Sequence, residues 1–210
     1  MSKEISGFAV KDVEIAEHRI AFQGHYRIEQ FTLRHRTFAG GWSPILHREM
    51  LERGSAAALL PYDPRADSVV LIEQFRIGAL GQDEAPWLVE IVAGLIDPGE
   101  TPEAVARREA QEEAGLSVGR TAPIAAYYPT PGVSSEFVTV FCGEVDSRQA
   151  PALGGLAEEG EDIRISVWPY AEIVAGLESG RFRNAVTLIA LQWLALHHER
   201  LRQDWLENAA

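Results

Sequence analysis

Apolar residues alternate with polar ones or form short runs along most of the chain, and these patterns predict strands interrupted by three helices. Alternation is typical of strands with one buried face, and short apolar runs are typical of strands buried on both faces. Strand-rich stretches are expected at residues 8–50, 56–61, 68–75, 87–92, 123–128, 137–145 and 163–168. Helices are expected at residues 102–114, 170–177 and 184–205.

Turn residues between the strands indicate the fold class. Residues 63–67 read Asp-Pro-Arg-Ala-Asp between two apolar runs, and this composition predicts the turn of an antiparallel hairpin. Strands and helices are interspersed while several strand pairs resemble hairpins. This combination predicts an α/β fold of the α+β type, a mixed sandwich instead of a doubly wound parallel sheet. Residues 1–52 are predicted to form an N-terminal antiparallel β subdomain, and residues 53–210 the main domain.

Composition and charge limit the classes of partner. The chain has 210 residues and a formal net charge of -12, which is unfavourable for binding nucleic acid or an anionic membrane. Its single cysteine, Cys142, excludes an internal disulfide and is expected to be buried and inert. The apolar run 188–196 is too short to span a bilayer. We therefore expect a cytoplasmic protein, in which something other than net charge must attract any phosphate ligand.

The helix expected at residues 102–114 carries an unusual group of carboxylates. Thr101 and Pro102 provide a start signal and Gly115 a stop signal. At 100° per residue, Glu113 lies about 40° to one side of Glu109, and Glu112 about 60° to the other. Two carboxylates ~5 Å apart repel by roughly 3 kcal/mol at an effective dielectric constant of 20, and a cation between them reverses that sign. Oxygen ligands without His or Cys favour Mg²⁺ or Mn²⁺.

The stretch from residue 94 to residue 116 resembles the Nudix box, G-x5-E-x7-R-E-U-x-E-E-x-G-U, in which U is aliphatic. The seven invariant positions are filled by Gly94, Glu100, Arg108, Glu109, Glu112, Glu113 and Gly115, and the two U positions by Ala110 and Leu116. The resemblance implies a Nudix α/β/α sandwich that hydrolyses a nucleoside diphosphate linked to another moiety, with divalent cations bridging the pyrophosphate oxygens.

The same resemblance implies roles for the residues of the box. Glu109, Glu112 and Glu113 would ligate the metal together with the carbonyl oxygen of Ala93. Arg108 and Glu100 would orient the ligating carboxylates, and Gly94 would allow close backbone approach.

Beyond the box, residues 10–205 resemble the bacterial ADP-ribose pyrophosphatase branch of the Nudix hydrolases. The resemblance lies in the segments VVLIEQFR, PWLVEIVAG, PTPGVSSE and GLAEEGEDI, and in Pro131, sixteen residues after Gly115. It implies Mg²⁺-dependent cleavage of ADP-ribose to AMP and ribose 5-phosphate by a homodimer with a swapped N-terminal subdomain. Two alternatives remain: a hydrolase of another nucleotide sugar such as GDP-mannose, and a non-catalytic module that senses ADP-ribose.

A second acidic cluster, Glu158-Glu159-Gly160-Glu161-Asp162, has glycine flanks that suit a loop closing over a substrate. By the family resemblance, Glu159 would be the general base and Glu161 a further metal ligand. Glu136 is the alternative base. Since a base must be free to accept a proton, one residue cannot fill both roles.

Substrate contacts are expected from side chains that suit phosphate, ribose or adenine. A guanidinium fork matches phosphate oxygens, and a base can stack on an aromatic ring. The candidates are Arg48, Arg76, Glu90 and Thr130, with Tyr26 or Phe31 as the stacking partner. The six histidines show no metal-ligand spacing, and His197 and His198 are expected to be exposed.

Overall fold

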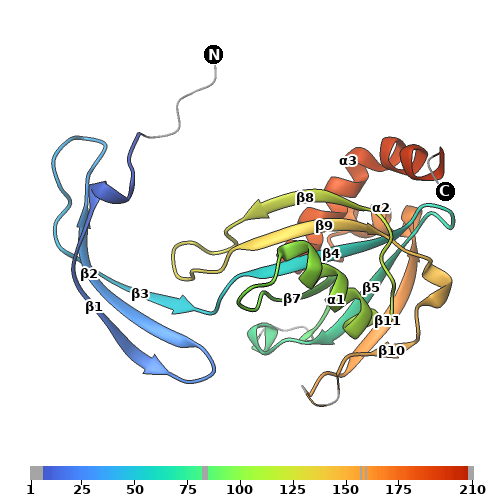
Figure 1. Ribbon diagram of the computed structural model, residues 1–210, viewed down its shortest axis with the longest axis horizontal. Helices are drawn as coiled ribbons and strands as arrows, with labels where there is room; N and C mark the ends of the chain where they lie inside the picture. The colour runs from blue at the N-terminus through green and yellow to red at the C-terminus, as the bar shows by residue number, and fades with distance from the viewer. Residues whose placement is uncertain (1–6, 82–84, 157, 159, 208–210) are drawn as a thin grey trace. The chain divides into compact units, whose positions relative to one another are not determined.

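The computed structural model describes residues 7–81, 85–156, 158 and 160–207 (Figure 1). The chain divides into two compact units. The first extends to Gly54 and includes Thr130–Glu136, and the second consists of Ser55–Pro129 and Phe137 onward. The sequence grouped residues 130–136 with the main domain, but in the structure they belong to the first unit.

The first unit is a three-stranded antiparallel sheet in the order β1-β2-β3. A short 3₁₀ turn, Val10–Asp12, precedes β1 (Val13–Gln23), β2 (Arg27–His35) and β3 (Leu46–Glu52). The segment 130–136 is fixed to β3 because the Leu51 amide donates to the Val133 carbonyl at 2.8 Å, and the Ser135 amide donates to the Leu51 carbonyl at 3.1 Å. All eleven residues of β1 are exposed.

The second unit is built on an eight-stranded mixed sheet. Its strands are β4 (Ala56–Asp63), β5 (Ser68–Phe75), β6 (Trp87–Glu90), β7 (Val92–Leu95), β8 (Thr121–Tyr127), β9 (Val138–Glu144), β10 (Leu153–Gly154) and β11 (Ile163–Pro169). The order is β10-β11-β5-β4-β9-β8, with β6 paired to β5 and β7 to β4. Only β4 and β9 pair in parallel within the described sheet. The predicted mixed fold is confirmed. The single strand expected at 87–92 was wrong, because β6 and β7 pair with different neighbours.

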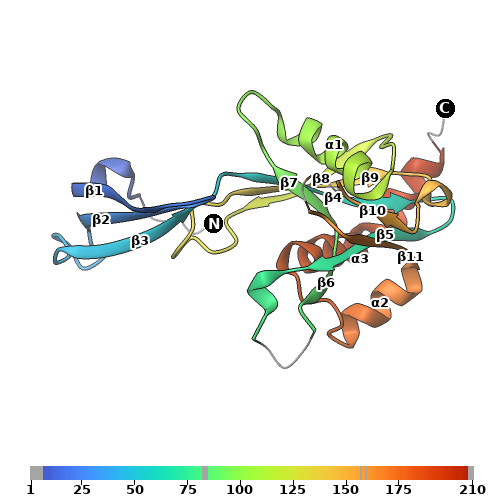
Figure 2. The ribbon, with the colours of Figure 1, turned by 90° about the horizontal axis from the view of Figure 1, so that it is seen from below.

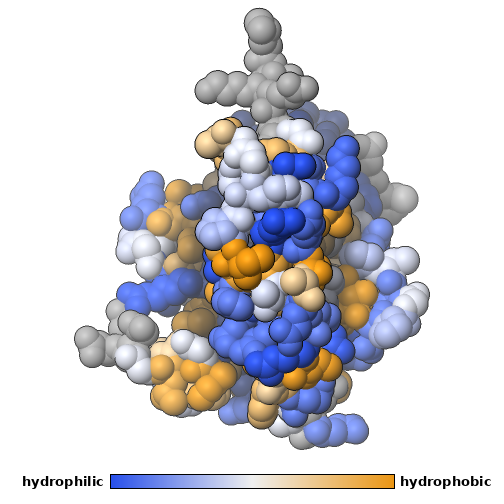
Figure 3. Space-filling model, turned by 90° about the vertical axis from the view of Figure 1, so that its left-hand side faces the viewer, coloured by the Kyte–Doolittle hydropathy of each residue, from blue (hydrophilic) through white to orange (hydrophobic). Residues whose placement is uncertain are grey.

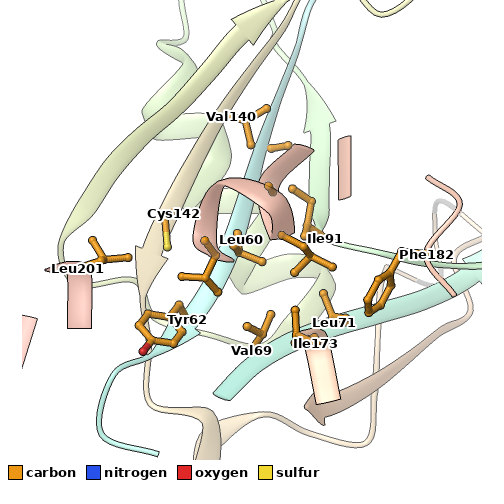
Figure 4. Close-up of a cluster of buried hydrophobic side chains, with 14 of the residues drawn as sticks. Leu60, Tyr62, Val69, Leu71, Ile91, Val140, Cys142, Ile173, Phe182 and Leu201 are labelled. Atoms are coloured by element: carbon orange, nitrogen blue, oxygen red, sulfur yellow. The ribbon is translucent and has the colours of Figure 1, made fainter. Parts of the chain in front are cut away.

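Helices cover both faces of this sheet. Figure 2 shows α1 (Pro102–Ala114) on one face and α2 (Tyr170–Glu178) with α3 (Ala185–Glu207) on the other. Strand β4 contributes side chains to the core on both faces of the sheet, because successive side chains of a strand point to opposite faces. Ala57 and Leu59 pack into the cluster under α1, whereas Leu60 and Tyr62 join the cluster under α3 (Figure 4). In the part of the chain that is described, no helix is long and apolar enough to cross a lipid bilayer.

Helix α1 begins and ends where the sequence predicts. The Oγ1 atom of Thr101 accepts from the Ala104 amide at 3.3 Å, and Pro102 occupies the first turn. Gly115 adopts a left-handed φ of 65° and returns its amide to the carbonyl of Gln111 at 3.0 Å. These caps set where the helix begins and ends, and the packing of Val105, Ala106 and Ala110 in the core sets which face it turns to the sheet.

The β4–β5 turn organises a polar cluster that the sequence did not indicate. Asp67 has a φ of 51°, and its Oδ1 atom accepts from the Tyr62 hydroxyl at 2.8 Å. The same atom lies 2.7 Å from His198 Nε2, whose ring stacks on Tyr170 with centroids 3.5 Å apart. The expectation that His198 is exposed was therefore wrong, since its side chain is only 14% exposed. Cys142 is buried as expected, and burial raises the pKa of its thiol.

Asp63 anchors the start of this turn. Its Oδ1 accepts from the amides of Arg65 and Ala66 at 2.9 and 3.0 Å, and its Oδ2 from the amide and hydroxyl of Ser147 at 2.9 and 2.7 Å. Burial favours the neutral acid, but the hydrogen bonds from Ala66 and Ser147 outweigh it and lower the pKa of Asp63.

Replacing Asp63 by alanine is expected to lower the free energy of unfolding by about 3 kcal/mol at pH 7, because several buried donors lose their acceptor. A carboxylate with a lowered folded-state pKa stabilises fully above its unfolded pKa and loses that effect as pH falls through the folded value. The difference from wild type should therefore shrink below about pH 4. Urea unfolding measures it, with the exposed Glu172→Ala as control; a pH-independent difference contradicts the charge-based explanation.

Candidate active site

The three carboxylates of α1 occupy different depths. Glu113 is 2% exposed, and its Oε2 atom accepts from the Ala93 amide of β7 at 2.9 Å. The side chain of Glu109 is 12% exposed and that of Glu112 is 31% exposed. The helix therefore carries its carboxylates from the sheet interface outward to solvent.

Gly94 allows the carboxylate of Glu109 to lie directly against the sheet. A Cβ atom at position 94 would lie 1.7 Å from Glu109 Oε1 and 2.1 Å from its Cδ atom. No side chain can be accommodated at such distances without moving Glu109. Gly94 pairs with Ala57 of β4, so the register of β7 on β4 fixes where Gly94 and Glu109 approach each other.

Arg108 holds the outer carboxylates together. Its Nη1 atom lies 2.8 Å from Glu109 Oε1 and 2.7 Å from Glu112 Oε2. Its Nε atom donates to Glu100 Oε1 at 3.3 Å, and Glu100 also accepts from the Asp97 amide at 3.1 Å. Burial opposes the charge of Arg108, but bonds to Glu112 and Glu100 raise its pKa. The loop before α1 is thus tied to the charged face of the helix.

Burial and like charge raise the pKa values of the inner carboxyls. Desolvation raises the pKa of Glu113 to about 8, and the charges of Glu109 and Glu161 add to the effect against the opposing Ala93 amide. The pKa of Glu109 is also raised by burial and by Glu112 and Glu161, with Arg108 opposing. These carboxyls therefore lack enough cationic partners within the protein to favour their charged form, and a bound cation would lower their pKa values.

Glu161, in the loop between β10 and β11, lies near enough for its charge to influence Glu109 and Glu113. Its Oε2 atom accepts from the Leu156 amide at 3.0 Å within the loop. A Cβ atom on Gly154 would lie 2.1 Å from the Glu113 carbonyl oxygen, so β10 passes directly against α1. The loop that follows Gly154 starts beside the carboxylates for this reason. Glu159 lies outside the described residues.

The donor set fits a hard divalent cation. Carboxylate oxygens are the ligands that Mg²⁺ prefers, and their mutual repulsion is relieved by positive charge. Within the described residues, no three His, Cys, Asp or Glu side chains already converge as a metal-binding group. Two of the acidic side chains turn toward protein donors instead, Glu112 toward Arg108 and Glu113 toward the Ala93 amide.

Arg76 and Glu90 form a bidentate pair beside α1. Arg76 Nε lies 2.9 Å and Nη2 2.7 Å from Glu90 Oε2. Glu90 is 2% exposed, and its Oε1 atom also accepts from Asn184 Nδ2 at 2.9 Å. Both carboxylate oxygens are thus engaged by protein donors, a geometry that favours an indirect role for Glu90 over the substrate contact expected from the sequence.

The remaining candidates lie in the first unit. Arg48 on β3 lines a hollow of about 670 Å³ with Arg19, Phe31, Glu49 and Val133 among its other residues. Glu136 forms an ion pair with Arg53 at 3.2 Å, and the Arg53 guanidinium lies 5.6 Å from the centre of the Tyr26 ring. Phe31 stacks on His18 with ring centroids 4.3 Å apart. The carbonyl of Thr130 accepts from the amides of Val133 and Ser134 at 3.1 and 3.0 Å.

Two residues near the carboxylates were not identified as candidates from the sequence. Gln74 is a buried amide in the apolar strand β5, and its Nε2 atom lies 3.5 Å from both Glu90 Oε2 and Glu113 Oε1. Asn184 precedes α3 and contacts Glu90 as described above. A polar residue inside the run VVLIEQF was the available signal for Gln74, whereas Asn184 reads only as a helix start.

A mixed sheet between helices, with a capped helix that carries clustered carboxylates, is the architecture of a Nudix domain. The family model described as the NUDIX domain matches residues 52–189. The chain therefore belongs to the Nudix family, and the expectation of a Nudix hydrolase is confirmed.

The chain is similar to named relatives over most of its length. It is 48% identical to an ADP-ribose pyrophosphatase of Escherichia coli (strain K12), covering 94% of this chain and 95% of the relative. It is 40% identical to the ADP-ribose pyrophosphatase of Haemophilus influenzae, covering 96% of this chain and 94% of that relative. A GDP-mannose pyrophosphatase of Shigella flexneri is 35% identical, covering 72% of this chain and 78% of the relative.

A solved structure titled an ADP compounds hydrolase has the same fold. It superposes with a TM-score of 0.70 at 20% identity, covering 93% of this chain and 99% of that structure. At this level of identity the similarity supports the fold alone.

Replacing Gly94 by alanine should cost about 1–3 kcal/mol of stability, because the methyl group overlaps the Glu109 carboxylate. The cost should fall to within about 0.5 kcal/mol in a Glu109→Ala background, where the overlapping atoms are gone. Thermal unfolding of the four proteins measures this coupling. Gly78→Ala is the control, since no atom lies within 4 Å of a Cβ built there. Equal costs in both backgrounds would show that Glu109 does not explain the glycine.

Proposed function

We propose that the protein hydrolyses the pyrophosphate bond of ADP-ribose to AMP and ribose 5-phosphate, using Mg²⁺ or, in its place, Mn²⁺. The observation that carries the proposal is the cluster of α1 carboxyls held against the sheet, which has too few cationic partners of its own and so suits a divalent cation. The similarity to ADP-ribose pyrophosphatases over 94% of the chain supports the choice of substrate.

Residues on three elements would hold the cation. Glu109, Glu112 and Glu113 come from α1, the carbonyl of Ala93 from β7, and Glu161 from the loop after β10. When bound, a divalent cation neutralises the pyrophosphate oxygens and lowers the pKa of a water molecule. Arg108 and Glu100 orient the outer carboxylates, and the Ala93 amide keeps Glu113 in place.

Glu159 is proposed as the general base, with Glu136 as the alternative. A base must be able to accept the proton of the attacking water, so a carboxylate with a strong cationic partner is a weaker candidate. Glu136 has such a partner in Arg53. This pairing supports the assignment of the base to the loop that also carries Glu161.

The substrate is proposed to be held by arginines and an aromatic ring. Arg76 presents a partly exposed guanidinium near the carboxylates, and Arg48 an exposed one on β3. Guanidinium forks suit the diphosphate, while Thr130 would contact the diphosphate or terminal ribose. Tyr26 is 37% exposed and Phe31 lines the hollow beside Arg48, so either ring is available for adenine.

We propose a cytoplasmic homodimer that exchanges its first unit. Strand β1 exposes Val13, Ile15, Ile20 and Phe22. Figure 3, which views one side of the molecule, shows apolar side chains exposed between polar ones there. Apolar residues on an unpaired sheet face gain stability when a second chain covers them. A fully active monomer, measured by light scattering during activity assays, would contradict the dimer.

Product analysis tests the proposed reaction. With Mg²⁺, ADP-ribose should give AMP and ribose 5-phosphate at a kcat/KM at least about tenfold above that for GDP-mannose, a difference of ~1.4 kcal/mol in transition-state binding. Chelation of the cation should abolish turnover. A preference for GDP-mannose would contradict the substrate assignment and leave the metal site in place. Binding of ADP-ribose without turnover would instead favour a sensing module.

Comparison of Glu159→Gln with Glu136→Gln decides the base. Loss of the base should lower kcat by about 10²–10⁴-fold with little change in cation affinity, because the carboxylate acts on the water and not on the metal. The pH–rate profile of that variant should lose its acidic limb. We expect this behaviour for Glu159→Gln, and its appearance in Glu136→Gln would reverse the assignment.

A further inference from the structure

Glu90 is the centre of a buried polar network that joins both faces of the sheet. Glu90 is the last residue of β6 and pairs in register with Ile72 of β5. Its side chain is 3% exposed and accepts from Arg76 on one side and Asn184 on the other. A buried carboxylate depends on such partners, because removing one leaves a charge without compensation.

Asn184 uses both ends of its amide. Its Oδ1 atom accepts from the Thr187 amide at 3.1 Å and lies 3.2 Å from the Thr187 hydroxyl, so it caps the start of α3. The Thr187 hydroxyl also accepts from the Ile91 amide at 3.0 Å, directly after Glu90 in the chain. Because the cap engages the oxygen of Asn184, its Nδ2 atom is turned toward Glu90 Oε1 at 2.9 Å.

The position of Glu90 in turn sets the orientation of Arg76. Glu90 engages the Nε and Nη2 atoms of Arg76, and a guanidinium is planar. The opposite edge is therefore directed away from Glu90. Among the described residues Nη1 makes no hydrogen bond, and the side chain is 44% exposed. Arg76 is thus a fixed fork with one edge available to an oxyanion.

Gln74 lies between this pair and the carboxylates of α1. Its Nε2 atom is 3.5 Å from Glu90 and equally 3.5 Å from Glu113, at the outer limit of a hydrogen bond. The available edge of Arg76 therefore has a defined position relative to Glu113. The pKa of Arg76, which burial would lower, is raised by Glu90, Glu113 and Glu161.

We infer that Asn184 is a positioning residue for Arg76. Acting through Glu90 from the far face of the sheet, it holds the available guanidinium edge where the diphosphate of the substrate binds. This inference rests on the proposed hydrolysis of ADP-ribose. The start of α3 would then contribute to substrate affinity, although it lies far from the carboxylate helix in the sequence.

The test is Asn184→Ser in the full-length protein. Serine also caps helices, so α3 keeps an acceptor while Glu90 loses its amide donor. KM for ADP-ribose should rise about tenfold, equivalent to ~1.4 kcal/mol, with kcat within about twofold. Asn184→Asp also retains a cap acceptor but places a carboxylate next to Glu90, and its KM should rise further. Gln192→Gly, on the exposed side of α3, controls for loss of helix stability and should leave KM unchanged.

Coupling to Arg76 separates positioning from general damage. In an Arg76→Gln background, Asn184→Ser should change KM by less than about twofold, since the side chain being positioned is absent. The inference is overturned if Asn184→Ser leaves KM at the wild-type value, or if its effect is as large without Arg76 as with it.

A nuclear magnetic resonance measurement keeps the inference testable if the proposed function fails. The Nε–H signal of Arg76, identified by its absence in Arg76→Lys, should shift in Asn184→Ser and not in Gln192→Gly. Wild-type protein that does not hydrolyse ADP-ribose would refute the proposed function alone. An unmoved Arg76 signal would refute the positioning role whatever the substrate.

Discussion

A carboxylate that is removed from water needs either a cationic partner or a proton, and α1 brings two such groups against the sheet. Glu113 is almost fully buried, and Glu109 lies so close to Gly94 that no side chain fits there. Burial raises the pKa values of both groups and nearby carboxylates add to the effect, so keeping these groups charged costs free energy unless a cation is bound. Under the proposed function, a divalent cation bound there would offset that cost and would explain how a chain of net charge -12 can attract a diphosphate.

The rest of the second unit keeps these carboxylates in position. The caps at Thr101 and Gly115 set the ends of α1, its packed apolar face sets its rotation, and the register of β7 on β4 sets where Gly94 meets the helix. On the other face of the sheet, α3 reaches the same region through Asn184 and Glu90. Polar contacts through Gln74 and Glu90 therefore link α1 to the start of α3, although each helix layer packs on its own hydrophobic cluster.

Local features could be predicted from the sequence, and features that depend on distant contacts could not. The bounds of α1 followed from Thr101, Pro102 and Gly115 because capping is decided within one turn. The pairing of β4 with β9, the division of residues 87–95 into two strands and the burial of His198 all depend on partners far along the chain. For the same reason the sequence indicated Arg76 as a substrate contact but did not indicate Asn184, which is linked to Arg76 through Glu90.

Thermal unfolding during a Mg²⁺ titration at pH 8 tests the central claim, that the α1 carboxylates form a group completed by a cation. The account predicts that wild-type Tm rises steadily with Mg²⁺, by an amount equivalent to about 2.7 kcal/mol at one hundred times the dissociation constant. The double variant Glu109→Gln/Glu113→Gln should start from a higher Tm and show no such rise, while Glu199→Gln should behave as wild type. A wild-type Tm that is insensitive to Mg²⁺, or an equal rise in the double variant, would contradict the account.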